Sequence, residues 1–305
     1  MCLVWGDRSL IQLRDFRPVG RFAPSPTGAL HLGSLLAALA SWLSVKSRGG
    51  QWLLRIEDLD GARERPGASI EMIRTLAAFG LESDAPVCFQ SERAPLYAEA
   101  LAQLDTLSLI YPCSCSRREL EGQAVYPGTC AAGIAVPKRP TALRVRVPDQ
   151  VLQFDDLLRG QCAQNLKFEV GDFVVRRADG VHAYQLAVVV DDAAQGITEV
   201  VRGADLLDST ARQIYLTEKL GLPTLKYAHV PLLLNADGSK LSKSAHALPV
   251  DPARPLDALR PLLRLLCGVW VSGANPQALL ATAVRDFSWA RLPSQLSVEE
   301  LLALN

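Results

Sequence analysis

Residues Arg21–Ser34 read RFAPSPTGALHLGS and join a short apolar segment to a long apolar run that continues to Val45. Pro24 and Pro26 cannot donate backbone hydrogen bonds and restrict the residues that precede them, so the strand predicted over 19–23 ends at this point. The apolar run from 30 to 45 is typical of a helix. The stretch therefore predicts a strand, a tight turn and a helix in succession.

This turn carries groups suited to an anion. Gly28 and Gly33 let the backbone approach a ligand closely, and the first turn of the helix presents N–H groups without helical partners. His31 lies at the start of the helix, where it could donate a hydrogen bond to a phosphate. The alternative is a proline-rich turn before a core helix, with His31 an ordinary surface residue.

A second stretch with matching chemistry lies about two hundred residues downstream. Lys240–Ser244 reads KLSKS and follows the turn formed by Asn235–Gly238. Two lysines three residues apart in a loop could reach phosphate oxygens as mobile charges. Alone, this stretch would be interpreted as a solvated loop, but together with the first it predicts a nucleotide site.

Composition excludes several classes of protein. The 305 residues are 49% hydrophobic, enough for a large core in one or two domains. Because 32 basic residues balance 32 acidic ones, only local patches could attract nucleic acid. Seven cysteines, an odd number, favour a reducing cytoplasm over a disulfide scaffold. The chain lacks an apolar run long enough for a membrane span, and residues 1–18 are expected to be an extension or the result of an early start codon rather than a signal peptide.

Strands and helices alternate through the first third of the chain. Predicted helices over 69–79 and 94–107 follow a second apolar strand, Gln51–Ile56, which predicts a doubly wound parallel α/β sheet of the Rossmann type. Glu57, Asp58 and Asp60 follow that strand directly, where open α/β sheets have their sites. For Asp58 and Asp60 the alternative is a capped loop that leads into the next helix.

Three cysteines lie within eighteen residues of a loop-rich segment. Cys113, Cys115 and Cys130 are interpreted as a metal site rather than a disulfide, and structural zinc requires four ligands. Spacing alone leaves the fourth open, with Glu119, Glu121 or a water as ordinary choices. The alternative is three reduced thiols without a metal.

The later segments predict an insertion in the sheet. Strands expected over 143–147, 151–154 and 173–177 form a small β-rich α+β unit, and Lys138–Arg146 is basic enough to contact RNA. Tyr184–Asp192 is an apolar segment that ends in two acids, after which the parallel sheet resumes. The expected divisions are an extension over 1–18, a first catalytic half over 19–107, an insertion over 108–183, a second half over 184–245 and a helical segment over 246–305.

The two phosphate-suited stretches resemble the signatures of class I aminoacyl-tRNA synthetases, and RFAPSPTG resembles the glutamyl branch of that class. The resemblance covers residues 19 to 250. About sixty residues follow Ser244, too few for an anticodon-binding domain. A short core with a Cys-x-Cys…Tyr-x-x-x-Cys insertion is similar to the glutamyl-queuosine tRNA(Asp) synthetases.

This resemblance implies an activity and its partners. The enzymes of this family form glutamyl-adenylate from L-glutamate and ATP without tRNA, and then transfer glutamate to queuosine in the anticodon of tRNA(Asp). ATP is expected to bind with Mg²⁺, and Zn²⁺ is expected to have a structural role. By the resemblance, the fourth zinc ligand is Tyr126. A cytoplasmic monomer that does not contact membranes is the default expectation.

The resemblance also assigns site residues. Arg21 is expected to pair with the side-chain carboxylate of glutamate and Glu57 to hold its α-ammonium group. His31 and Lys243 are expected to be catalytic and to stabilise charge as the carboxylate of glutamate attacks the α-phosphorus of ATP. For Arg202 the alternative is a salt bridge to Asp205 or Asp192. The full sets are Arg21, Phe22, Ala23, Pro24, Ser25, Glu57, Tyr184 and Arg202 for glutamate, His31, Gly33, Ser34, Lys240 and Lys243 for ATP, and Cys113, Cys115, Tyr126 and Cys130 for zinc.

Three other functions compete with this one. The first is a glutamyl-tRNA synthetase core that charges the tRNA 3′ end, against which the short C-terminal part counts. The second is a non-enzymatic tRNA-binding protein, against which the intact candidate site residues count. The third is a nucleotidyltransferase that acts on a small molecule, against which the glutamyl-type wording of the first stretch counts.

Overall fold

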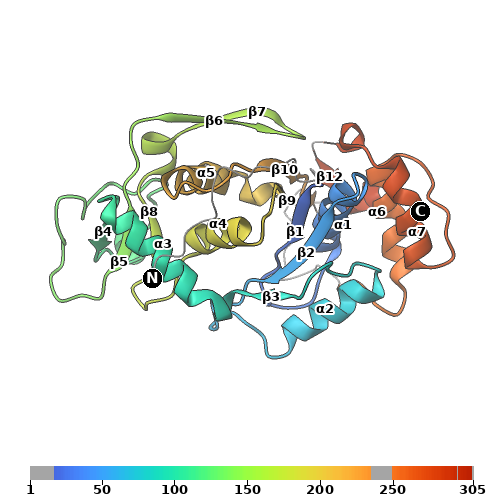
Figure 1. Ribbon diagram of the computed structural model, residues 1–305, viewed down its shortest axis with the longest axis horizontal. Coiled ribbons are helices and arrows are strands. Elements are labelled where there is room, and N and C mark those ends of the chain that lie inside the picture. Colours follow the sequence, from blue (N-terminus) through green and yellow to red (C-terminus); the bar gives the residue numbers. More distant parts are fainter. Residues whose placement is uncertain (1–16, 235–248, 294, 304–305) are drawn as a thin grey trace, which may run out of the picture.

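A central sheet organises the part of the chain that the computed structural model describes, residues 17–234, 249–293 and 295–303 (Figure 1). Its strands lie in the order β3-β2-β1-β9-β10-β6-β7, and all neighbouring pairs are parallel except β6 with β7. The predicted parallel α/β sheet is therefore confirmed. The bounds are β1 Val19–Phe22, β2 Gln51–Ile56, β3 Cys88–Phe89, β6 Val151–Asp156, β7 Gly160–Asn165, β9 Glu199–Gly203 and β10 Lys226–Val230.

Helices pack around this sheet in two buried clusters. One cluster joins α1, α2, α6 and α7 to β1 and β2, and the other joins α3, α4 and α5 to β5 and β8. The helices expected over 30–45, 69–79 and 94–107 begin and end within two residues of these predicted bounds. The helices of the structure are α1 Leu32–Lys46, α2 Ala68–Ala78, α3 Ala94–Thr106, α4 Tyr184–Ala194, α5 Thr210–Lys219, α6 Pro255–Cys267, α7 Pro276–Asp286 and α8 Val298–Leu302.

A separate antiparallel sheet lies at the opposite end of the molecule from α6 and α7 (Figure 1). It consists of β4 Ile110–Cys113, β5 Ala142–Val145 and β8 Phe173–Arg176, paired in that order. Two of its strands match the expected small β-rich unit. The division of the chain at 108 and 183 stays a prediction.

The strand expected over 151–154 belongs to the central sheet and not to the small antiparallel sheet. The segment 151–154 was expected in the small unit, but β6 extends the central sheet beside β10, where Asp156 is in register with Tyr227. The buried Asp156 carboxylate also bonds His229 of β10, at 2.6 Å between Oδ2 and Nδ1. This polar contact helps to hold the β6–β7 hairpin on the edge of the central sheet.

The segment that contains Lys240–Ser244 lies outside the described residues, but its flanks are described. On one side, β11 Leu233–Leu234 pairs with β12 Leu296–Ser297. On the other, Pro249 pairs with His31 and the Val250 N–H donates to the Leu30 carbonyl at 3.0 Å. The chain thus returns from the lysine segment directly beside the start of α1. Within the described ranges, every helix is too short or too polar to cross a membrane.

Candidate active site

A cleft of about 470 Å³ opens where the strands β1 and β2 end and α4 begins. Open α/β sheets bind ligands at the carboxyl ends of their strands, so this is the expected position of a site. The lining residues come from the segments after β1, β2 and β3, from the segment that leads into the first residue of α4, and from the turn after β9. They are Ala23, Ser25, Glu57, Leu59, Asp60, Arg63, Gln90, Arg177, Val181, His182, Ala183, Tyr184 and Leu206.

Four of the eight residues expected to bind glutamate line this cleft, namely Ala23, Ser25, Glu57 and Tyr184. The other four do not. The Phe22 ring is buried and stacks on Trp52 with 6.5 Å between ring centroids, so it packs in the core. Pro24 contributes its carbonyl, which accepts the Glu57 N–H at 3.0 Å and holds the two turns together.

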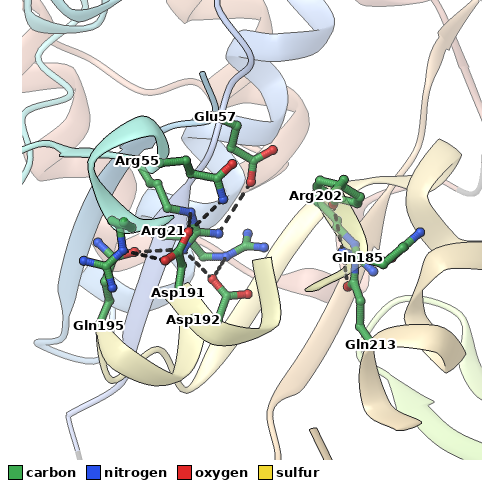
Figure 2. Close-up of polar contacts among 12 residues, drawn as sticks. Arg21, Arg55, Glu57, Gln185, Asp191, Asp192, Gln195, Arg202 and Gln213 are labelled. Carbon is green, nitrogen blue, oxygen red and sulfur yellow. Dashed lines mark hydrogen bonds and ion pairs between the residues drawn. The ribbon is translucent and has the colours of Figure 1, made fainter. Parts of the chain in front are cut away.

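Arg21 lies beneath the cleft in a buried ionic cluster (Figure 2). Its Nε donates to Asp192 Oδ1 at 3.0 Å, and Arg55 Nη1 donates to the same oxygen at 2.7 Å. Arg55 is fully buried on β2, and Nη1 also donates to Gln195 at 2.8 Å. Asp192 thus links β1, β2 and α4 directly beneath the cleft.

Asp191 extends this cluster to the segment before α3. Its carboxylate accepts hydrogen bonds from the Gln90 amide at 2.8 Å, Arg93 Nε at 2.5 Å and the Tyr97 hydroxyl at 2.8 Å. The sequence pattern identified the two acids at 191 and 192 but gave no role to Asp191 and named Asp192 only as an alternative partner of Arg202. Their partners lie about 90 to 170 residues away, and short motifs carry no signal for such pairing.

The Glu57 carboxylate has an unusual charge environment. Burial raises its pKa to about 7, although the guanidinium groups of Arg55 and Arg21 lower it. The pKa of Asp192 is held below its usual range, because Arg21 and Arg55 outweigh the effect of burial. Near neutral pH, Glu57 is therefore poised between its charged and neutral forms, as functional carboxyl groups often are.

Arg202, the eighth expected glutamate residue, is buried beside Tyr184 rather than in the cleft lining. Its guanidinium donates to His229 Nε2 at 3.0 Å, Gln213 Oε1 at 2.7 Å, Thr210 Oγ1 at 2.9 Å and, over 3.4 Å, the Tyr184 hydroxyl. The alternative salt bridge to Asp192 is not formed, because Asp192 binds Arg21 and Arg55.

The neutral imidazole ring of His229 orients Arg202. Its Nδ1–H donates to Asp156, which leaves Nε2 as the acceptor for Arg202. Burial and the Arg202 charge both lower the pKa of His229, while Asp156 opposes them. A neutral imidazole is the form that this arrangement requires.

His31 is the N-cap of α1. Its Nδ1 accepts the Ser34 N–H at 3.2 Å, so the ring proton of the neutral form lies on Nε2. Gly33 lies close beside it, since a Cβ at this position would lie 3.2 Å from the imidazole ring and the ring would have to shift by a few tenths of an ångström. The start of α1 therefore combines helix N–H groups and a histidine donor, as expected for phosphate. Lys240 and Lys243 lie outside the described residues.

The two other acids after β2 have different roles. Asp58 accepts the Ser91 N–H at 2.9 Å and the Ser91 hydroxyl at 2.7 Å, so it joins the turn after β2 to the turn before α3 and does not cap the helix that follows it. Asp60 lines the cleft and pairs with Arg63 at 2.6 Å and Arg177 at 3.1 Å. Those arginines lower its pKa. Arg177 was not identified as a site residue from the sequence.

The three cysteines meet at the predicted position. The sulfur atoms of Cys113, Cys115 and Cys130 lie within 4.8 Å of one another, and those of Cys115 and Cys130 are 3.6 Å apart. The Tyr126 oxygen lies 3.3 Å from the Cys113 sulfur and 3.6 Å from that of Cys115. A tetrahedral ion with Zn–S bonds of about 2.3 Å implies sulfur separations of about 3.8 Å, so the cluster is compatible with zinc.

The surroundings of the cluster favour the thiolate form of Cys130, whereas burial raises the pKa of Cys115 and of Tyr126. Arg144 Nε donates to the Cys113 sulfur at 3.2 Å, and its guanidinium lies 3.8 Å above the Tyr126 ring. Although burial opposes it, backbone N–H groups of 135 and 114 lower the pKa of Cys130 to about 6. Glu119, one candidate for the fourth ligand, binds Ser116 and Arg139 instead.

Comparisons with known proteins show the family of the chain. The model of the family "tRNA synthetases class I (E and Q), catalytic domain" matches residues 19–126 and 132–279. The glutamyl-Q tRNA(Asp) synthetase of Cupriavidus metallidurans is 57% identical over 79% of this chain and 82% of its own length. That of Xanthomonas campestris is 52% identical over 92% of this chain and 95% of its own.

A solved glutamate tRNA ligase from Elizabethkingia meningosepticum, in complex with its amino acid, is 26% identical with a TM-score of 0.78. The match covers 95% of this chain and 69% of that one. The chain belongs to the catalytic-domain family of the class I glutamyl and glutaminyl tRNA synthetases and, within it, to the glutamyl-Q tRNA(Asp) synthetases.

Proposed function

We propose that this protein is an ATP-dependent ligase that activates L-glutamate as glutamyl-adenylate and then transfers glutamate to queuosine in tRNA(Asp). The observation that carries the proposal is the cleft at the ends of β1 and β2, where Glu57 and Tyr184 lie among the lining residues. Two relatives named for this reaction match 79% and 92% of the chain. The competing 3′-charging function is not favoured, because the similar relatives carry the glutamyl-Q name.

The residues suggest a division of roles within the first step. Glu57 would accept the α-ammonium group of glutamate, while Arg21 and Arg202 would attract its side-chain carboxylate from beneath the cleft. His31 Nε2–H and the first N–H groups of α1 would stabilise charge on the ATP phosphates, bound with Mg²⁺. Lys243 would add a positive charge during in-line attack, and no protein nucleophile is required.

Zinc would have a structural role in this proposal. Cys113, Cys115 and Cys130 would supply three thiolates and Tyr126 the fourth ligand, consistent with the distances among them. Arg144 would offset the excess negative charge of three thiolates and a phenolate around one divalent ion. We further propose that the protein acts as a cytoplasmic monomer.

The activation step is tested by exchange of labelled pyrophosphate into ATP, in the absence of tRNA, with each of the acidic and amide amino acids in turn. Exchange with glutamate alone is the expected result. Exchange that requires tRNA would favour the 3′-charging function, and no exchange under either condition would contradict the proposal.

A further inference from the structure

The fully buried Arg55 guanidinium is incompletely satisfied. Among the residues that the structure describes, its Nε and Nη2 atoms have no hydrogen-bond partner, although Nη1 has two. Nη2 lies 3.6 Å from the Glu57 carboxylate, and Nε lies 3.9 Å from that of Asp191. Buried donors without partners are costly and uncommon in native structures, so this one requires an explanation.

Two of the three surrounding acids, Asp191 and Asp192, already accept hydrogen bonds from other donors. Asp192 shares one oxygen between Arg21 and Arg55, and Asp191 already accepts from Gln90, Arg93 and Tyr97. Glu57 is the carboxylate that lines the cleft, and its side chain is only 9% exposed. A movement of a few tenths of an ångström would bring it within hydrogen-bond range of Nη2.

We propose that Arg55 is a positioning residue, which keeps the Glu57 carboxylate charged and directed into the cleft to receive the ammonium group of the amino acid. Figure 2 shows the arrangement, with Arg55 between Glu57 and the two aspartates of α4. The inference rests on the proposed function, in which Glu57 binds that ammonium group.

The charges around Glu57 are consistent with this role. Arg55 and Arg21 favour its ionised form, whereas Asp191, Asp192 and burial oppose it. Tyr184 also faces it, and burial raises the pKa of that phenol, so the ring stays neutral. The other charged or titratable groups of the cleft lining are Asp60, Arg63, Arg177 and His182. Burial already raises the pKa of Glu57 to about 7. Loss of Arg55 would raise this pKa further and leave the Glu57 carboxyl group mostly neutral at physiological pH.

The test is the pH dependence of the KM for glutamate in pyrophosphate exchange, between about pH 6 and about pH 8.5. For the wild-type protein, KM should fall as pH rises through about 7 and then level off. In Arg55→Gln, the midpoint should rise by about one pH unit. The KM would then increase about fivefold at pH 7 and less than twofold at about pH 8.5, with kcat nearly unchanged.

Further variants separate positioning from a loss of structure. Arg55→Lys keeps the positive charge, so the midpoint of its KM profile should lie between those of the wild type and Arg55→Gln. If Arg55→Gln does not fold, the profile of Arg55→Lys tests the positioning role. Glu57→Gln should make KM high and independent of pH, and adding Arg55→Lys to it should change nothing more. Arg48→Lys alters a matched ion pair with Glu199 outside the cleft and should leave the profile unchanged.

The outcomes distinguish the inference from the proposed function. If the wild-type protein shows no exchange with glutamate, the proposed function fails. If it does, and a folded Arg55 variant keeps the wild-type midpoint or loses activity equally at every pH, the positioning role of Arg55 is wrong.

Discussion

His31 combines two roles at one residue, and substitutions can separate them. Asparagine should keep the N-cap bond to the Ser34 N–H but lose the donor at Nε2. We therefore expect His31→Asn to retain the stability of the wild type and to slow adenylate formation about a hundredfold or more, the usual cost of removing one donor to developing charge. Pyrophosphate exchange and thermal unfolding measure the two effects.

His31→Ala is the matched variant, since it removes both the cap and the donor. It should slow the reaction equally and also lower the free energy of unfolding by about 1 kcal/mol. A normal exchange rate in His31→Asn would show that the histidine serves only as a helix cap.

The charged form of Glu57, which the proposed function requires, should lower the free energy of unfolding of the protein. Its pKa is about 7 in the folded protein against a usual 4.5, so the folded state favours the neutral form. That contribution to stability is fully present below about pH 4.5 and is lost as pH rises toward 7. Glu57→Gln imitates the neutral form, so it should raise Tm relative to the wild type at pH 8 but not at pH 4.5.

Thermal unfolding of both proteins across this pH range checks the prediction. Asp58→Asn is a suitable control, because Asp58 is adjacent to Glu57 in sequence but bonds Ser91 outside the cleft lining. An equal change in Tm for Glu57→Gln at both pH values would contradict the inferred pKa of Glu57.

Single residues also show the limit of prediction from sequence. Glu57, Ser25, Ala23 and Tyr184 were identified through a motif resemblance, and all line the cleft. The burial of Arg55 with Asp191 and Asp192 was not predicted, because it depends on residues far apart in the sequence. A charged residue within an apolar strand was the available signal.

At the scale of elements, local patterns predicted the helices well because amphipathic spacing and caps are local properties. Gly80, for example, ends α2 with a φ of +78°, a conformation that suits glycine.

The segment Tyr184–Asp192 is harder to assign from its sequence. Its three consecutive valines favour a strand by propensity, yet it is the helix α4, whose buried face is set by tertiary packing. The hairpin β6–β7 was assigned to the wrong sheet for a similar reason, since its partner β10 is distant in sequence.

The insertion provides a prediction at this scale. Cys113→Ser should lower the zinc content to well below one ion per chain and reduce Tm by at least about 4 °C, because zinc ligation stabilises only the folded segment. Tyr126→Phe keeps the ring beneath Arg144 but removes the oxygen, so it should weaken zinc binding without disrupting the fold.

Cys162→Ser is the control, since this cysteine lies on β7, apart from the cluster. It should leave zinc content and Tm unchanged. A wild-type protein that is free of metal and has the same Tm with and without added zinc would rule out a structural zinc site.

At the scale of the whole molecule, the sheet brings together residues that the sequence separates. His31 precedes α1 beside Pro249, and Glu57 follows the neighbouring strand β2, so the residues proposed to bind phosphate and the amino acid lie at the same end of the parallel strands. The small sheet with the cysteine cluster lies at one end of the molecule, and α6 and α7 lie at the other (Figure 1). Because the net charge is zero, attraction to tRNA must depend on local groups.

The position of the transferred glutamate tests the central claim most directly. The protein would be incubated with labelled glutamate, ATP and bulk tRNA from cells with and without queuosine, and the tRNA would then be digested with nuclease. We expect the label on an anticodon fragment, and only when queuosine is present. Label on the 3′-terminal adenosine, independent of queuosine, would contradict the proposed function and show an enzyme that charges tRNA.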